Sequence, residues 1–188
     1  MTIQNTKQAG ETARFEREIR HGKYLAQSDT EIKWGWGTPA GQQRMRRRAS
    51  LIAEAAGLDP RLHVLEVGCG TGLFTERFAA TGCQLTAVDL SPDLLSRARE
   101  RVQNLPNVRF ELKPFEECRG IGPFDAIIGS SVLHHLELHP ALGNMRDLLK
   151  PGGRLAFAEP NHLNPQIFCE RKFRRFFPDI SPDETAFY

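Results

Sequence analysis

Residues 64–75 read VLEVGCGTGLFT and hold the pattern that decides the fold. The stretch begins with apolar, strand-forming residues and then has glycines at alternate positions, Gly68, Gly70 and Gly72. Glycine adopts positive φ at little cost, and its missing side chain lets a ligand lie against the backbone. A strand, a glycine-rich turn and a helix over about residues 71–81 predict the start of a nucleotide-binding α/β unit.

The next apolar run, residues 85–90 (LTAVDL), predicts a second strand with Asp89 at its end. Asp89 follows Gly70 by about 20 positions, the spacing at which a carboxylate at the end of the second strand reaches a ribose. A carboxylate accepts two hydrogen bonds from a ribose diol and favours an unphosphorylated ribose. The loop lacks the Gly-Lys-Ser/Thr ending of a phosphate loop, and Leu73 stands where a dinucleotide fingerprint has its third glycine.

These motifs resemble those of the class I S-adenosylmethionine-dependent methyltransferases, in particular the small-molecule type found in bacteria. The resemblance rests on E-x-G-x-G-x-G from Glu66, on the acidic end of strand two and on LLKPGGRLAFAEP at residues 148–160. It covers about residues 44–161 and implies a Rossmann-like, doubly wound α/β fold with a mostly parallel sheet. It also implies S-adenosyl-L-methionine as cofactor, S-adenosyl-L-homocysteine as product and a small-molecule acceptor.

The chain has 188 residues, a length that predicts a single domain large enough to bury a hydrophobic core. A net charge of +2 is too small to indicate a nucleic-acid partner, and none is expected. No apolar run reaches the ~20 residues of a membrane span, and the N-terminus has no apolar signal core. Four scattered cysteines predict neither a zinc site nor a disulfide framework. We expect a cytoplasmic protein without membrane contact, and its oligomeric state stays open.

The sequence suggests three segments. Residues 1–37 form an N-terminal helix and aromatic lid segment, residues 38–161 the S-adenosylmethionine-binding domain, and residues 162–188 a truncated cap helix and loop. In the first segment, residues 1–10 are predicted to be loose and residues 11–20 to form a short charged helix. The domain's other elements follow from apolar runs and cap residues. Strands are predicted at residues 107–112, 124–129 and 154–158, and helices at 39–56 (capped by Thr38, ended by Gly57), 92–103 (capped by Ser91) and 141–149.

The C-terminal segment departs from the resembled fold. That fold has seven strands, and its last two form a hairpin after strand five. Residues 161–188 read as helix and loop, so the hairpin is expected to be missing. Either it has been lost, or the chain is a fragment, which we favour. The basic, aromatic run IFCERKFRRFF at residues 167–177 could dock on an anionic membrane, but a substrate-cap helix is preferred.

The resemblance assigns the cofactor to the glycine loop and to the ends of the neighbouring strands. The loop residues are Gly68, Cys69, Gly70 and Gly72, with Cys69 as a small residue within it. Glu66 is expected to organise the loop or reach the methionine end of the cofactor, and Asp89 to hold the ribose. Leu90 packs on the adenine or is buried at the strand end. Ser130 lies at the carboxyl end of the fourth strand, where ligands bind in open α/β sheets.

The adenine pocket departs from the family pattern. The family often has an aspartate shortly after strand three that is hydrogen-bonded to the adenine amine, and this sequence has Lys113 and Pro114 there. A backbone carbonyl, Glu116 or water must then bind the amine. Phe115 is a candidate wall of the adenine pocket, with a core position as the alternative.

Aromatic and basic residues before the domain are candidates for a cover. Tyr24 and Trp36 stand among glycines and could form a lid over the cofactor, although they could also only pack the segment against the domain. Arg44 begins the run RMRRR and could hold the carboxylate of the cofactor or of an acidic substrate. The alternative for this run is a solvated helix face.

Two histidines after strand four, His134 and His135, are the candidate catalytic residues. Either could deprotonate a substrate hydroxyl or amine, whereas a role in orienting or capping the helix is the alternative. Glu159 and Asn161, after strand five, could bind a polar substrate group or hydrogen-bond within the loop. No cluster of acidic residues and histidines has metal-ligand spacing, which argues against a metal-assisted mechanism.

Together these features predict methyl transfer to a small molecule by in-line displacement, without a covalent enzyme intermediate. The first alternative is a non-catalytic cofactor-binding or regulatory protein with the same fold. The second is a nicotinamide-dependent oxidoreductase, for which the loop spacing fits worse and a Tyr-x-x-x-Lys pair is lacking.

Overall fold

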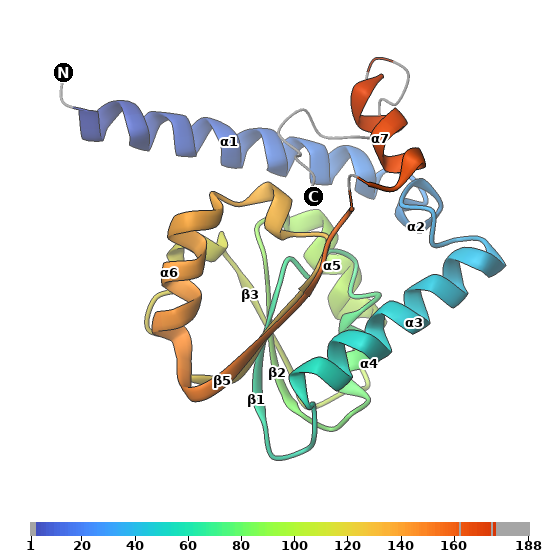
Figure 1. The fold of residues 1–188 in the computed structure, drawn as a ribbon, viewed down its shortest axis with the longest axis vertical. Coiled ribbons are helices and arrows are strands. Elements are labelled where there is room, and N and C mark those ends of the chain that lie inside the picture. Colours follow the sequence, from blue (N-terminus) through green and yellow to red (C-terminus); the bar gives the residue numbers. More distant parts are fainter. Residues whose placement is uncertain (1–2, 162, 174, 176–188) are drawn as a thin grey trace.

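The computed structural model of the chain describes residues 3–161, 163–173 and 175. Within them, five parallel strands form one sheet in the order β3-β2-β1-β4-β5 (Figure 1). The strands are β1 (His63–Val67), β2 (Gln84–Asp89), β3 (Val108–Leu112), β4 (Phe124–Ser130) and β5 (Leu149–Ala158). The sequence predicted all five, and the doubly wound Rossmann-like fold is confirmed.

The strand order reverses beside β1, which pairs with β2 on one side and β4 on the other. Such a reversal leaves a crevice outside the carboxyl ends of the central strands, where open α/β sheets bind ligands. The glycine loop follows β1 directly, Asp89 ends β2 and Ser130 ends β4. The topology therefore brings the candidate residues of three strands to one edge of the sheet.

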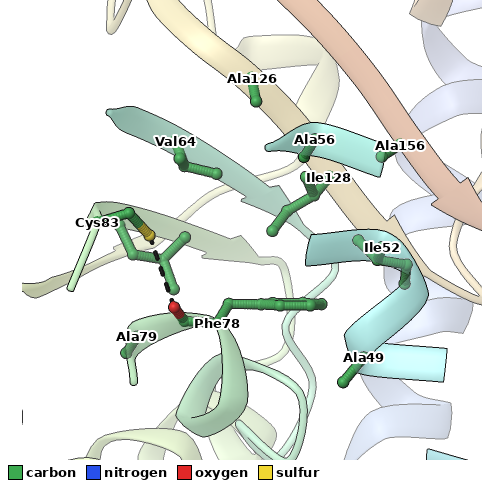
Figure 2. Close-up of a cluster of buried hydrophobic side chains, with 11 residues drawn as sticks. Ala49, Ile52, Ala56, Val64, Phe78, Ala79, Cys83, Ala126, Ile128 and Ala156 are labelled. Carbon is green, nitrogen blue, oxygen red and sulfur yellow. Dashed lines mark hydrogen bonds between the residues drawn. The ribbon is translucent and has the colours of Figure 1, made fainter. Parts of the chain in front are cut away.

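Helices cover both faces of the sheet because the strands are apolar on both sides. On one face, α3 (Pro39–Ala56) and α4 (Thr75–Ala79) pack through Ile52 and Phe78 onto Val64 and Ile128, as Figure 2 shows. The short helix α5 (Pro92–Arg101) continues this layer over β2. On the other face, α6 (Leu138–Leu148) and the 3-10 turn η1 (Phe115–Glu117) bury Met145 and Phe115 against β1 and β4.

Helix ends predicted from single residues are confirmed. The Thr38 hydroxyl accepts a hydrogen bond from Gly41 N at 3.0 Å at the start of α3, and Gly57 ends that helix with φ of 66°. The Ser91 hydroxyl caps α5 by accepting from Leu94 N at 3.4 Å. These signals are local, so the sequence alone suffices to place them.

The N-terminal prediction was right that residues 11–20 are helical and wrong about the loose residues before them. Residues 3–26 form one helix, α1 (Ile3–Ala26), where a loose start and a short helix were expected. A second short helix, α2 (Thr30–Lys33), lies within the expected lid loop. The polar sequence of α1 has no apolar stripe, and its face is defined instead by packing against α5 and α2.

Two further boundaries differ from the prediction. The helix after the glycine loop begins at Thr75 rather than near Thr71, because Gly70 and Gly72 have positive φ and keep the chain in turns. Strand β5 begins at Leu149 rather than at residue 154, because Leu149 already pairs with Phe124 of β4. Both differences come from backbone geometry and strand pairing beyond the local sequence.

The helix predicted in the C-terminal segment is α7 (Pro165–Lys172), and its role as a substrate cap stays a prediction. No strand follows β5 among residues 159–161, 163–173 and 175, and the rest of the expected truncated segment lies outside the described residues. Within the same limits, no helix is long and apolar enough to cross a membrane.

Candidate active site

A cavity of about 830 Å³ lies at the carboxyl ends of β1, β2 and β4. This volume falls within the ~300–1,000 Å³ of small-molecule and cofactor sites. Its floor comes from the strand ends and its cover from the N-terminal residues. Of the predicted residues, those that line it are Gly68, Cys69, Gly70, Asp89, Leu90, Phe115, Glu116, Ser130, His134, His135, Glu159, Asn161, Trp36 and Arg44.

Asp89 is fixed at the floor by backbone donors. Gly70 N donates to its Oδ2 at 2.8 Å, and Ser91 N donates to its Oδ1 at 2.9 Å. Burial raises the pKa of the Asp89 carboxyl, and the two backbone hydrogen bonds oppose that shift. Each carboxylate oxygen can accept more than one hydrogen bond, so both can still receive a hydroxyl donor from the cavity.

The glycines of the loop have separate roles. Gly70 lines the cavity, and a Cβ there would lie 3.1 Å from the Trp34 ring, which covers the loop. Gly72 does not line the cavity, and a Cβ there would lie 2.9 Å from the Ala98 Cα of α5. The assignment of Gly72 as a cofactor contact stays a prediction. Its role is to let the loop pack against α5.

Glu66 lies beneath the loop and does not line the cavity. The pKa of its carboxyl is raised to about 8, mainly by burial and also by the charge of Asp89, while the nearby Thr75 hydroxyl acts to lower it. Its Oε2 and the hydroxyls of Thr71 and Thr75 are buried without a hydrogen-bond partner among the described atoms. Of the two roles expected for Glu66, the position favours support of the loop. Cys69 is buried as well, and burial raises the pKa of its thiol far above its usual range, so the thiol is unreactive.

Two tryptophans, rather than Tyr24, cover the floor. Trp34 lies over Gly70, and Trp36 packs edge-on against Phe74 with ring centres 5.7 Å apart. Tyr24 is exposed on α1 and does not line the cavity, and the Lys33 ammonium lies 3.6 Å from its ring centre. Tyr24 belongs to a helix whose other face meets the cavity, so the lid prediction finds no support at this residue.

Arg48 lies deeper in the cavity than the predicted Arg44. Its guanidinium donates to Ser131 Oγ at 2.8 Å and to Ser130 Oγ at 3.3 Å, and it lies 5.2 Å from the Trp36 ring centre. Burial lowers the pKa of Arg48, while Glu159 raises it. Arg44 is exposed at the rim, where it donates to the Gly35 carbonyl at 3.0 Å. Arg48 follows Arg44 by one turn of α3, and this spacing was the only sequence signal that it could reach Ser130 and Ser131.

His134 and Glu159 form a close pair at the ends of β4 and β5. His134 Nδ1 lies 2.6 Å from Glu159 Oε2, and Glu159 Oε1 accepts from Val132 N at 2.9 Å and Leu133 N at 3.0 Å. Burial acts to raise the pKa of Glu159, but His134 and the backbone donors outweigh it and lower the pKa. Glu159 is therefore a carboxylate that holds Nδ1–H and leaves Nε2 of His134 as the ring's acceptor.

The three adenine candidates, Leu90, Phe115 and Glu116, all line the cavity. Phe115 is 4 % exposed and packs in the core, yet it also lines the cavity. Leu90 is half-buried on the cavity wall beside Asp89. Glu116 forms an ion pair with Arg14 of α1. Asn161 is an exposed rim residue.

The residues that the sequence did not reveal come mainly from α1. Arg14, Glu18 and Gly22 line the cavity at intervals of one helical turn. Glu18 Oε2 lies 3.3 Å from His135 Nδ1, and the His135 ring centre is 4.3 Å from that of His134. Their four-residue spacing would have been a signal only once a long helix was known. No group of three or more His, Cys, Asp and Glu side chains in the described part of the chain is arranged to hold a metal ion.

Comparisons with known proteins agree with this geometry. A family model described as a methyltransferase domain matches residues 65–155. Nodulation protein S of Rhizobium tropici is 29% identical over 135 residues, which are 70% of this chain and 57% of that protein. A ubiquinone biosynthesis O-methyltransferase of Xylella fastidiosa (strain 9a5c) is 35% identical over 130 residues, 64% of this chain and 52% of the relative.

A solved structure has the same fold. The N-methyltransferase NodS from Bradyrhizobium japonicum WM9, in complex with S-adenosyl-L-homocysteine, superposes with a TM-score of 0.63 at 26% identity, covering 74% of this chain and 71% of that one. The chain spans slightly more than half of the two curated relatives. The relatives give no support to the non-catalytic alternative. The motifs, the sheet and these matches together show that residues 65–155 are a methyltransferase domain of the class I S-adenosylmethionine-dependent kind.

Proposed function

We propose that this chain transfers a methyl group from S-adenosyl-L-methionine to a small-molecule acceptor, in the cytoplasm. One observation carries the proposal. Asp89 accepts a hydrogen bond from Gly70 N of the glycine loop, and both residues lie on the floor of the same cavity. The names of the relatives, among them an O-methyltransferase and an N-methyltransferase, support this class of reaction. The unpaired state of all four cysteines supports a reducing compartment.

The residues present fit a nucleoside that carries a charged amino-acid end. The carboxylate of Asp89 suits the ribose hydroxyls, and Leu90 and Phe115 flank the adenine. Gly68 and Gly70 line the cavity, and the chain that joins the ribose to the amino acid would pass along their backbone. The half-buried guanidinium of Arg48, beside Ser130, suits the carboxylate better than exposed Arg44 does.

Bound S-adenosyl-L-methionine supplies a methyl group that its sulfonium charge already activates. The chain must bring the acceptor atom into line, exclude water and receive a proton. Positioning of this kind is worth up to about 7–11 kcal/mol in the most favourable cases. His134 is suited to receive the proton at Nε2, because Glu159 holds its Nδ1–H. Trp34 and Trp36 keep water from the loop side of the cavity.

A methyl-transfer assay tests the proposal. The wild-type chain is incubated with S-adenosyl-L-methionine labelled in the methyl group and with panels of small amines, phenols and aliphatic alcohols. We expect a labelled product and S-adenosyl-L-homocysteine with at least one acceptor class. Asp89→Asn should lose most of this turnover, whereas Asp93→Asn, an exposed carboxylate on α5, should retain it.

Two results would contradict the proposal. Tight cofactor binding without any methylated product across all panels would favour the non-catalytic alternative. Preferential binding of NAD would favour the oxidoreductase.

A further inference from the structure

One face of α1 covers the cavity. Figure 1 shows α1 running across the carboxyl edge of the sheet, above α5. The cavity-lining residues of this helix recur at helical spacing: Arg14, Phe15, Glu18, His21, Gly22 and Leu25. A ligand held against Asp89 and the glycine loop would therefore lie beneath α1.

Gly22 is the point at which α1 meets α5. A Cβ at this position would lie 2.4 Å from Ser91 Oγ and 2.7 Å from Ser91 Cβ. Ser91 cannot move aside easily, because its hydroxyl caps α5 and its N–H donates to Asp89. Only a glycine permits this approach. The helix is thereby seated two residues from the proposed ribose carboxylate.

The opposite side of the cavity holds α1 through charged side chains. Arg14 donates to the His135 carbonyl at 2.7 Å and forms an ion pair with Glu116 of η1. Glu18, one turn further along, lies 3.3 Å from His135 Nδ1 in the 3-10 turn η2 (Leu133–His135). These contacts join α1 to the wall opposite α5, so the helix bridges the cavity.

The C-terminal end of α1 is fixed more firmly than its middle. Arg97 of α5 donates to the carbonyls of Ala26 and Ser28 and to the hydroxyl of Thr30, the latter two at 3.1 Å. Three acceptors on one guanidinium anchor the segment that follows α1. An outward movement of α1 would therefore pivot at this end and break the Arg14 and Glu18 contacts first.

We propose that α1 is a lid over the adenosine end of the cofactor site, seated through Gly22 and latched by Arg14 and Glu18, and that its opening sets the rate of cofactor exchange. The proposal rests on the proposed function, because it takes S-adenosyl-L-methionine as the ligand beneath the lid. Gly22, Arg14 and Glu18 are positioning residues in this account.

Hydrogen–deuterium exchange with a matched pair of variants tests the seating. Gly22→Ala adds a methyl group where Ser91 leaves no room, and Gly143→Ala adds one in α6 where no atom lies within 4 Å. Alanine favours helix more than glycine does, so a weaker helix cannot explain faster exchange in Gly22→Ala. We expect residues 12–25 to exchange about tenfold faster or more in Gly22→Ala, as for a locally opened segment, and at the wild-type rate in Gly143→Ala.

The same variants test gating, through the dissociation rate of S-adenosyl-L-homocysteine measured by stopped-flow displacement. Gly22→Ala should release it several-fold faster than wild type, and Gly143→Ala should not. Unchanged exchange in residues 12–25 of Gly22→Ala would overturn the seating. Faster exchange with an unchanged dissociation rate would overturn the gating. A wild-type chain that binds no S-adenosyl-L-homocysteine would overturn the proposed function and the gating, while exchange would still decide the seating.

Discussion

The floor of the cavity and its cover are held in place by different kinds of contact. The floor consists of paired parallel strands and the glycine loop. The loop is held to β2 by backbone hydrogen bonds, because Gly68 N and Cys69 N donate to the Val88 carbonyl at 2.9 and 3.2 Å. The cover, residues 12–37, is attached mainly through side chains, above all arginines. The backbone hydrogen bonds of a buried sheet break only when the whole domain unfolds, whereas side-chain contacts at the surface can break one at a time.

Two arginines of α5 join the cover to the floor. Arg97 holds the segment after α1, and Arg101, one turn later, donates to the Thr71 carbonyl of the loop at 3.1 Å and pairs with Glu31 of α2. The C-terminal half of α5 thus contacts both the cover and the cofactor loop. Because the floor is held by backbone pairing and the cover by side chains, we expect substitutions in the floor to affect folding and chemistry. Substitutions in the cover should instead affect cofactor binding.

The largest expected effect is on the floor. Gly72→Ala combines strain at φ of 78° with a Cβ 2.9 Å from the Ala98 Cα, and should lower the free energy of unfolding by about 3 kcal/mol. Gly152→Ala has the same φ with no atom within 4 Å, so it should cost only about 1 kcal/mol. Urea unfolding measures both. Equal losses would mean that close packing on α5 does not matter.

The second prediction concerns chemistry on the floor. His134→Gln removes the proposed proton acceptor and should lower kcat about 100-fold, the lower end of general-base contributions, on whichever acceptor the panel identifies. The affinity for S-adenosyl-L-homocysteine should change little. His139→Gln, an exposed histidine on α6, is the control. A wild-type kcat in His134→Gln would remove His134 from the chemistry.

The third prediction concerns Glu66 beneath the loop. Its pKa is about 8 when folded, above the ordinary value of 4.5, so the folded state binds the proton more tightly. Its contribution to stability is thus full below pH 4.5 and is lost as pH rises to about 8. Between pH 6 and 8, wild type should lose roughly 2 kcal/mol relative to Glu66→Gln, at about 1.4 kcal/mol per pH unit. Parallel pH profiles of unfolding free energy would contradict this assignment. The exposed Glu54→Gln serves as control.

The smallest expected effect is on the cover. Arg14→Gln removes the latch to Glu116 and His135 and should weaken S-adenosyl-L-homocysteine binding about three- to tenfold, as for loss of one charge-assisted contact. The unfolding free energy should stay within about 0.5 kcal/mol of wild type, since α1 adds little to the core. Arg20→Gln, on an exposed part of the same helix, should change neither quantity. Calorimetry that finds equal affinities in both variants would argue against the latch.

The sequence predicted the floor of the cavity better than its cover. The floor was predicted because its signals are local: glycines where φ is positive, an aspartate at a strand end, and Ser91 at a helix start. The cover was not, because α1 has no apolar periodicity, and its cavity face depends on where α5 lies.

Side-chain choices between neighbours were also beyond the sequence. Arg44 and Arg48 lie one turn apart on α3, and only the distance to Ser130 and Ser131 distinguishes them. Tyr24 was expected in a lid loop because the helix that carries it was not foreseen.

The most direct test of the central claim is calorimetric titration of the chain with S-adenosyl-L-homocysteine, with NAD as the comparison ligand. We expect micromolar binding of one molecule per chain, a strong loss of affinity in Asp89→Ala, and no measurable heat with NAD. A folded chain that binds no S-adenosyl-L-homocysteine, or one that binds it equally well without the Asp89 carboxylate, would contradict the assignment of this cavity.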